Sequence, residues 1–275
     1  MLIGALVLLL AVPGLLVQLL VDGAPALNRF GWIRFLTSAT WDPTLGRELY
    51  GALPFIAGTL LTSVAALMLC LPFSLPVALF VGEYFPHNRL GKTVRLLTDL
   101  LAGIPSIVYG LWGFYALRPL IDRIDGPEYN GYGYLTSVLI LAVMIIPYAS
   151  SLTAEFIKLT PTRLKEAAYS LGATRTEVIC RVILPTARSG ILSAYILSLG
   201  RALGETMAVT MLIGNTDTLP RSLFDTGQTM ASLIANQFGE ASGVKLSSLM
   251  AIGLILFLIT ALVNGMAKLI IGRQK

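Results

Sequence analysis

Two oppositely charged side chains stand four residues apart inside a long apolar stretch of the chain. Residues 198–208 read S-L-G-R-A-L-G-E-T-M-A, which places Arg201 and Glu205 among leucine, alanine and glycine. Residues four apart share one face of a helix, but arginine before glutamate is not the order that best stabilises a helix. A guanidinium can bind two oxygens of an anion at once, because its N–H groups form a planar fork. The pair therefore has the chemistry of an anion site in which Glu205 could neutralise Arg201 until the anion arrives.

The composition of the chain is that of a membrane protein. Of its 275 residues, 55% are hydrophobic and 13% are charged, whereas soluble domains carry roughly 25% charged residues. The net charge of +5 does not indicate binding to nucleic acid, because the basic residues are spread thinly between apolar runs. The two cysteines, Cys70 and Cys180, fit neither a disulfide framework nor a metal site.

Six segments have the length and apolarity of transmembrane helices, which need about 20 mainly apolar residues. They are 2–21, 53–81, 97–117, 135–157, 191–213 and 247–271. We therefore predict an all-α integral membrane protein with six transmembrane helices. Pro72 and Pro76 are expected to bend the second span or end it early, and Gly103 and Pro105 interrupt the third.

The loop charges predict that both chain termini are cytoplasmic. This orientation places the richest basic cluster, between residues 158 and 188, in the cytoplasm, as the positive-inside rule requires. The external loops are then 22–52, 118–134 and 214–246. The first apolar run has no basic start and no cleavage site followed by a soluble domain, so we expect a retained helix rather than a signal peptide.

The charged pair falls inside the fifth predicted span, where a charge costs on the order of 3 kcal/mol on insertion scales. Three interpretations remain open: a salt bridge that fixes helix packing, a lining of a translocation path, or a gate whose partners change between two states. For the second we predict a substrate path lined by Ser198, Arg201, Glu205 and Thr206. An anion crossing the membrane needs a cation to offset its desolvation.

Other polar side chains in the spans are weaker candidates for the path. They are Thr59, Thr62, Ser63, Ser106, Ser150 and Ser151. The alternative for each is hydrogen bonding between or within helices. Asp99 and Glu155 lie near the cytoplasmic helix ends, where we expect solvation or pairing with loop arginine and lysine.

The cytoplasmic segment 160–185 is predicted to form two short helices. Thr160 is a candidate N-cap with Pro161 at the first helical position, and Gly172 is a natural residue to follow the helix end.

Thr174 and Glu177 have the T-x-x-E spacing of a capping box, which would begin the second helix. Leu184-Pro185 is expected to end that helix before the fifth span. Such a helix–turn–helix suits insertion into a groove on another protein. The alternative is an ordinary amphipathic loop.

The same segment resembles the EAA loop of permease subunits of binding-protein-dependent ABC importers with the type I, MetI-like fold. The matching residues are Glu166, Ala167, Ala168, Gly172, Leu184 and Pro185. Val182 stands where isoleucine is more usual.

Three further stretches are similar to phosphate importer permeases, and the second and third of them together are closer to the PstC type than to its PstA-type partner. They are G-I-P-S-I-V-Y-G-L-W-G at 103–113, R-A-L-G-E-T-M-A-V at 201–209 and T-M-A-S-L-I-A-N at 229–236. The resemblance covers about residues 50–270, which implies a first helix and external loop at 1–50 and a permease core at 51–275 with the coupling loop 160–185.

The resemblance implies a bacterial inner-membrane transport subunit that is not itself an enzyme. Coupling to the ATPase would involve Glu166, Ala167, Ala168, Leu171 and Gly172. The implied partners are a second, PstA-type permease, two ATPase subunits, an external phosphate-binding protein and membrane lipid. ATP and Mg²⁺ would bind to the ATPase and not to this chain.

The chain lacks the residues that the rival functions require. Gly91-Lys92-Thr93 is not a P-loop, because Pro86 stands where the first glycine is needed. The sequence has neither H-E-x-x-H nor a cysteine and histidine cluster, so a membrane enzyme has little support. A permease for sulfate, molybdate or an organic solute, and a stand-alone channel or secondary carrier, remain as alternatives.

Overall fold

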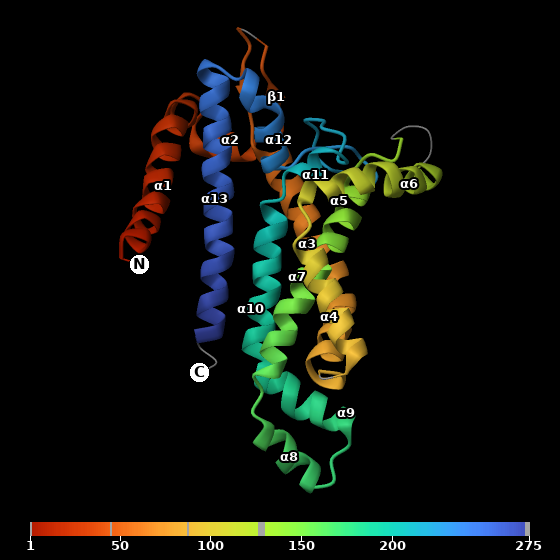
Figure 1. The fold of residues 1–275 in the computed structure, drawn as a ribbon. Helices are drawn as coiled ribbons and strands as arrows, with labels where there is room; N and C mark the ends of the chain where they lie inside the picture. Colours follow the sequence, from red (N-terminus) through yellow and green to blue (C-terminus); the bar gives the residue numbers. More distant parts are fainter. Residues whose placement is uncertain (1, 45, 87, 126–129, 273–275) are drawn as a thin grey trace. The chain divides into compact units, whose positions relative to one another are not determined.

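The computed structural model describes the chain except residues 1, 45, 87, 126–129 and 273–275, and leaves undescribed the side chains of 2–6, 8, 125 and 267–272. It is almost wholly helical (Figure 1). The α-helices are α1 (Leu2–Phe30), α2 (Trp32–Thr37), α3 (Leu53–Leu79), α4 (Arg89–Ala102), α5 (Ser106–Trp112), α6 (Arg118–Asp125), α7 (Tyr134–Lys158), α8 (Thr162–Ser170), α9 (Arg175–Val178), α10 (Leu184–Leu203), α11 (Met207–Thr210), α12 (Met230–Gln237) and α13 (Gly243–Gly272).

Short π-helical, 3₁₀ and extended segments complete the described structure. The π-helices are η1 (Phe80–Tyr84), η2 (Gly113–Leu117) and η3 (Ile179–Ile183), and η4 (Phe238–Glu240) is a 3₁₀ helix. The strands β1 (Trp41–Asp42) and β2 (Leu49–Tyr50) pair antiparallel.

The spans confirm the predicted all-α membrane architecture. Within the described residues, five helices are long and apolar enough to cross a membrane, and one bent helix pair makes a sixth if it is a single span. The five are Leu9–Phe30, Leu53–Tyr84, Tyr134–Lys158, Arg175–Leu203 and Gly243–Met266.

The third predicted span, 97–117, is not one straight helix. The helical pair Arg89–Ala102 and Ser106–Ile124 is bent by 95° at the break between them. Pro105 has no N–H to donate and disfavours helical geometry in the residue before it. The helix therefore stops at the Gly103–Pro105 segment.

The second span does not end early, because α3 continues through both prolines to Leu79. The Ser150 hydroxyl donates to the Ser74 carbonyl at 3.2 Å, and the Ser74 and Tyr195 hydroxyls lie 3.1 Å apart. Polar contacts thus surround α3 between its two prolines.

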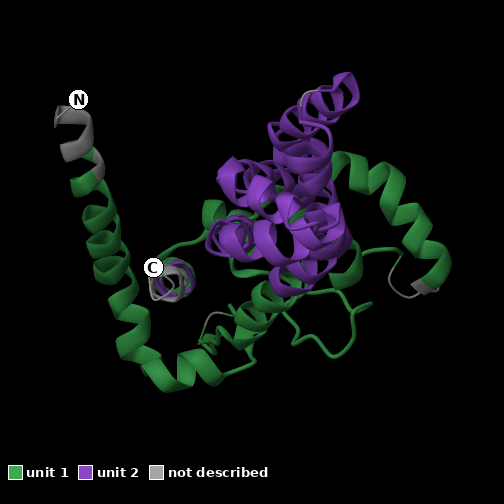
Figure 2. Cartoon of the chain, turned by 90° about the horizontal axis from the view of Figure 1, so that it is seen from below, with its two compact units in different colours: residues 1–62, 110–137, 203–261 green, residues 63–109, 138–202, 262–275 purple. Residues whose placement is uncertain are grey.

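The chain forms two compact units, each described by itself (Figure 2). Unit 1 contains residues 1–62, 110–137 and 203–261, and unit 2 contains 63–109, 138–202 and 262–275. Their boundaries fall inside α3, α7 and α13 as well as near the ends of α5 and α10.

Unit 1 has an aromatic core at the end that carries the strand pair. The Trp41 ring packs edge-to-face on Tyr50 at 4.7 Å and on Phe55 at 5.2 Å between centroids. Nearby, Thr229 and Ser232 form a capping box that begins α12, so the T-M-A-S string at 229–232 is a helix start. Together these contacts fix the external segments to the start of α3.

Unit 2 has a core where α3, α7 and the cytoplasmic loop meet. Its buried residues are Ala78, Val81, Ala154, Ile157, Val178, Ile179 and Ile183. The loop therefore does not hang free, because its second helix is anchored by apolar contacts to two spans.

Close packing in unit 1 gives the first prediction. A Cβ at Gly58 would lie 2.3 Å from the Gln228 carbonyl oxygen, whereas a Cβ at Gly14 would meet nothing within 4 Å. We expect Gly58→Ala to cost about 1–3 kcal/mol, as overpacking does, and so to lower the melting temperature of the purified protein. Gly14→Ala, on the exposed α1, is the control and should leave that temperature unchanged or slightly raised. Equal melting temperatures for the two variants would contradict this packing.

Candidate functional site

Arg201 lies in the last turn of α10, in unit 2. Its Nη1 donates a long hydrogen bond of 3.5 Å to the carbonyl oxygen of Ala102, the last residue of α4. Its Cζ lies 5.1 Å from the centroid of the Tyr148 ring. Helix C-termini carry partial negative charge, and aromatic faces attract cations. The guanidinium is therefore stabilised by a helix end and an aromatic ring.

The end of α4 is itself held by a second tyrosine. The Tyr109 hydroxyl donates to the Leu101 carbonyl at 2.8 Å, and Tyr109 is mostly buried. The last carbonyls of a helix have no partner within it. Arg201 bonds that of Ala102, and Tyr109 is a second donor to that of Leu101, which also accepts from the Ile104 N–H at 3.2 Å. Tyr109 and Tyr148 were not among the site residues predicted from the sequence. The available signal was a polar aromatic residue inside an apolar span.

Glu205 does not share a helical face with Arg201, so that expectation was wrong. The fifth span was predicted to run from 191 to 213, but α10 ends at Leu203 and α11 begins at Met207. In unit 1, Glu205 Oε1 accepts a hydrogen bond from the Ala208 backbone N–H at 3.2 Å. The carboxylate thus satisfies a free donor at the start of α11, and Gly204 weakens the helix at the break.

The two hydroxyls predicted for the path bond to nearby backbone. Ser198, fully buried in unit 2, donates to the Ala194 carbonyl at 2.8 Å. Thr206, in unit 1, donates to the Gly204 carbonyl at 3.2 Å. The roles of Ser198, Arg201, Glu205 and Thr206 in a substrate path stay predictions.

Several weaker polar candidates make hydrogen bonds within or between helices. Thr59 and Thr62 donate to carbonyls of Phe55 and Gly58 one turn back in α3, and the Met230 N–H donates to Thr59 at 2.9 Å. These contacts favour the packing interpretation for the polar residues of α3.

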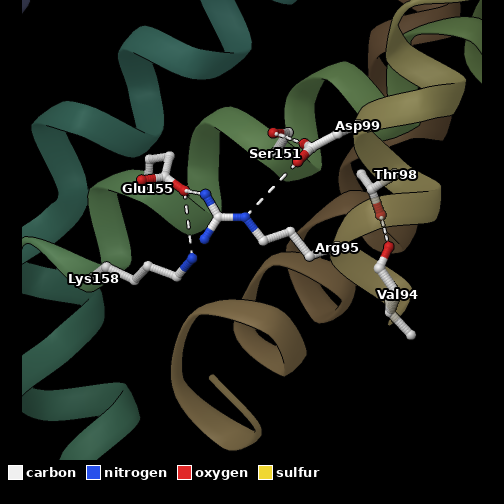
Figure 3. Close-up of polar contacts among 7 residues, drawn as sticks. All are labelled: Val94, Arg95, Thr98, Asp99, Ser151, Glu155 and Lys158. Carbon is white, nitrogen blue, oxygen red and sulfur yellow. Dashed lines mark hydrogen bonds and ion pairs between the residues drawn. The ribbon is translucent and has the colours of Figure 1, made fainter. Parts of the chain in front are cut away.

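A cluster of charged side chains joins α4 to α7 within unit 2 (Figure 3). Arg95 binds Glu155 at 2.6 Å and lies 3.8 Å from Asp99, and Lys158 lies 3.4 Å from Glu155. The Ser151 hydroxyl donates to Asp99 at 2.7 Å. The arginine and both carboxylates are about half exposed, so each pair contributes about 0–1 kcal/mol. This is the pairing expected for Asp99 and Glu155.

The cytoplasmic loop has the two predicted helices with shifted limits. α8 begins at Thr162 with Pro161 as its N-cap, one residue later than predicted. Gly172 has φ of 83°, which confirms that it follows the helix end in the left-handed conformation.

The capping box of the second helix is also confirmed. The Thr174 hydroxyl accepts from the Glu177 N–H, and Glu177 Oε2 accepts from the Thr174 N–H at 2.9 Å.

The predicted stop at Leu184-Pro185 was wrong. The helix passes from α9 through η3 into α10, and Arg175–Leu203 is one continuous span. Pro185 lies in the first turn of α10, directly after a π-helical segment. Proline is tolerated there, since the π-helical turn changes the local hydrogen-bond pattern.

Part of the loop faces outward and part faces the core of unit 2. Glu166 and Ala167 are exposed, and Leu171 is 89% exposed. Ala168 and Ala173 pack against the buried cluster of unit 2. Leu164 and Tyr169 of the same loop are exposed as well, and a group of exposed apolar side chains suits docking to another protein.

Comparison with known proteins identifies relatives over nearly the whole chain. The family model "Binding-protein-dependent transport system inner membrane component" matches residues 74–275. The phosphate transport system permease protein PstC of Haemophilus influenzae is 39% identical, covering 98% of this chain and 90% of the relative. The protein of the same name from Mesorhizobium japonicum is 40% identical, covering 98% and 87%.

A solved structure has the same fold. The methionine ABC transporter MetNI, in inward-facing conformations, matches with a TM-score of 0.64 and 18% identity, over 79% of this chain and 93% of that chain. At this identity the likeness concerns the fold alone. It confirms the predicted MetI-like permease fold.

The capping box gives a prediction about the loop. Thr174→Ala removes the hydroxyl that accepts from Glu177 N–H, so the amides of residues 175–178 should exchange hydrogen about fivefold faster, the typical effect of losing an N-cap side chain. Hydrogen–deuterium exchange read by mass spectrometry measures this. Thr176→Ala, an exposed threonine on the same helix, is the matched control. Equal exchange in both variants would show that the capping box does not hold α9.

Proposed function

The chain belongs to the family of binding-protein-dependent transport system inner membrane components, and from this premise we propose that it moves inorganic phosphate across the membrane as one permease subunit of an ATP-driven importer. The chain is a multi-pass inner-membrane protein and, like its family, a non-catalytic subunit. The names of relatives that share about 40% identity over 98% of the chain support phosphate as the solute.

The observation that carries the proposed path is the environment of Arg201. A guanidinium has five N–H donors, and the contact with the Ala102 carbonyl uses one of them. Its planar fork matches the oxygens of phosphate better than a point charge does. In this proposal Arg201 is the cation that offsets the loss of water around the phosphate.

The path must also release its anion. A full counter-charge beside Arg201 would cancel its attraction, whereas a bare arginine would hold phosphate too tightly. A helix-end carbonyl and the Tyr148 ring carry only partial negative charge. They stabilise the arginine while leaving it net positive, which suits transient binding. Ser198, Glu205 and Thr206 complete the proposed path, with Glu205 as the group that alternates with phosphate during the cycle.

Energy for transport comes from partner chains in this proposal. The loop residues Glu166, Ala167, Ala168, Leu171 and Gly172 dock on an ATPase, which binds ATP and Mg²⁺. Two such ATPase subunits, a non-identical PstA-type permease and an external phosphate-binding protein make up the complex, which lies in membrane lipid. Closure of the ATPase pair opens the path to the outside, and release of the pair opens it to the cytoplasm.

The test is phosphate uptake by proteoliposomes that contain the purified complex and its binding protein. Arg201→Ala should lower uptake by about 30-fold or more, the effect of removing one partner of a desolvated charge pair. Arg201→Lys keeps the charge but loses the planar fork of N–H donors. Its uptake should therefore lie between that of the unaltered complex and that of Arg201→Ala. Arg188→Ala, an exposed arginine on α10, is the matched control and should transport normally.

The same assay separates the rival functions. Unchanged uptake in Arg201→Ala would remove Arg201 from the path. Uptake of sulfate, molybdate or an organic solute in place of phosphate would assign another substrate. Uptake that continues with a hydrolysis-deficient ATPase would favour a channel or secondary carrier.

A further inference from the structure

Two basic side chains of the cytoplasmic loop, one from each of its helices, converge on η1, the π-helix that follows α3. Lys165, on α8, places Nζ 2.5 Å from Glu83 Oε2. Arg175, at the start of α9, donates from Nη2 to the carbonyl oxygens of Glu83 at 3.2 Å and of Tyr84 at 2.9 Å. Both acceptor residues belong to η1, and all four residues lie in unit 2.

The pair between Lys165 and Glu83 is poorly solvated. Their side chains are 17% and 11% exposed, in contrast to the half-exposed groups of the cluster around Arg95. Water screens such a pair much less than a surface pair. Removal of one partner leaves an uncompensated charge with little access to water, so the two side chains are strongly held together.

Arg175 makes a contact of a different kind with the same segment. Its Cζ lies 4.2 Å from the Tyr84 ring centroid while its Nη2 bonds the two carbonyls. A lysine would lose the planar contact with the Tyr84 ring, although its single nitrogen could donate to both carbonyls. Arg175 therefore fixes the orientation of the η1 end as well as its distance from α9.

The η1 segment also packs tightly on α7. A Cβ at Gly82 would lie 3.1 Å from the Ala154 carbonyl oxygen and 3.1 Å from a side-chain carbon of Ile157. Val81 and Ile157 belong to the same buried cluster as Val178 of the loop. A displacement of η1 would therefore shift the residues of α7 that it contacts as well as α3.

We propose that Lys165 and Arg175 are positioning residues that couple the loop to η1, so that movement of the docked loop pulls on α3 as well as pushing on it. Apolar contacts resist compression but separate easily, whereas an ion pair and directional hydrogen bonds also resist separation. When the loop moves toward α3, the buried cluster of unit 2 transmits the movement. When the loop moves away from α3, the contacts of Lys165 and Arg175 transmit it. This inference rests on the proposed function, since it needs the loop to be moved by an ATPase.

The test uses the assembled complex in proteoliposomes with its binding protein, and measures ATP hydrolysis and phosphate uptake in the same sample. The variants are Lys165→Met, Glu83→Gln, Arg175→Lys and the exchanged pair Glu83→Lys with Lys165→Glu. Arg163→Gln changes an exposed charge on the same helix α8 and is the matched control. Co-purification of the ATPase with each variant reports whether docking is intact.

Lys165→Met and Glu83→Gln should retain the ATPase and its hydrolysis, while the number of ATP molecules hydrolysed per phosphate imported rises at least about fivefold, the lower end of coupling between sites. Arg175→Lys should show a smaller rise in the same ratio. The exchanged pair should bring the ratio back toward that of the unaltered complex, and Arg163→Gln should not change it.

Three results would overturn the inference. The first is an unchanged ratio of ATP hydrolysed to phosphate imported in both Lys165→Met and Glu83→Gln. The second is loss of the co-purifying ATPase from these variants. The third is a parallel fall of hydrolysis and uptake that the exchanged pair does not reverse. Each leaves the proposed function standing when the unaltered complex imports phosphate. Failure of the unaltered complex to import phosphate with ATP would instead refute the proposed function itself.

Discussion

The arrangement of unit 2 depends on how a guanidinium can be accommodated in a membrane-spanning helix. A charge there is costly unless protein groups stabilise it. Arg201 lies in the last turn of α10, where the helix dipole favours a cation, and its guanidinium reaches the last carbonyl of α4 and the Tyr148 ring. Two helix ends and one aromatic ring thus stabilise the positive charge, and no carboxylate among the described residues forms an ion pair with it. An arginine so held remains an attractive partner for an anion, which is the basis of the proposed phosphate path.

The helix breaks provide backbone hydrogen-bonding groups to polar side chains inside the protein. Backbone groups within a membrane must be satisfied by protein, and the break after Ala102 supplies carbonyls to Arg201 and Tyr109. The break after Leu203 supplies an N–H of α11 to Glu205. The helix ends therefore serve as polar groups inside an otherwise apolar protein. On the cytoplasmic side the π-helical η1 presents its carbonyls to Arg175 in the same way.

Local signals in the sequence predicted local structure well. The capping box of Thr174 and Glu177 and the left-handed Gly172 are confirmed, because these motifs depend only on neighbouring residues. The fourth span is also correct to within one residue at each end. The break at Gly204 and the continuity through Pro185 were missed, because the first depends on the Glu205 carboxylate bonding the start of α11 and the second on a π-helical turn before the proline. Tyr148 beside Arg201 and Glu83 beside Lys165 could not be predicted, because the fold alone brings these distant residues together.

The most direct test of the central claim is whether the Arg201 guanidinium touches the transported phosphate. Solid-state NMR of the reconstituted complex can measure dipolar coupling between the phosphorus of bound phosphate and isotope-labelled guanidinium nitrogens, with the Arg201→Lys complex as the reference. A charge-assisted N–H···O bond is about 2.7–2.9 Å long, so direct contact predicts strong coupling that disappears in the reference. Coupling of equal strength in both complexes, or none in either, would contradict the account and leave Arg201 as a residue of helix packing alone.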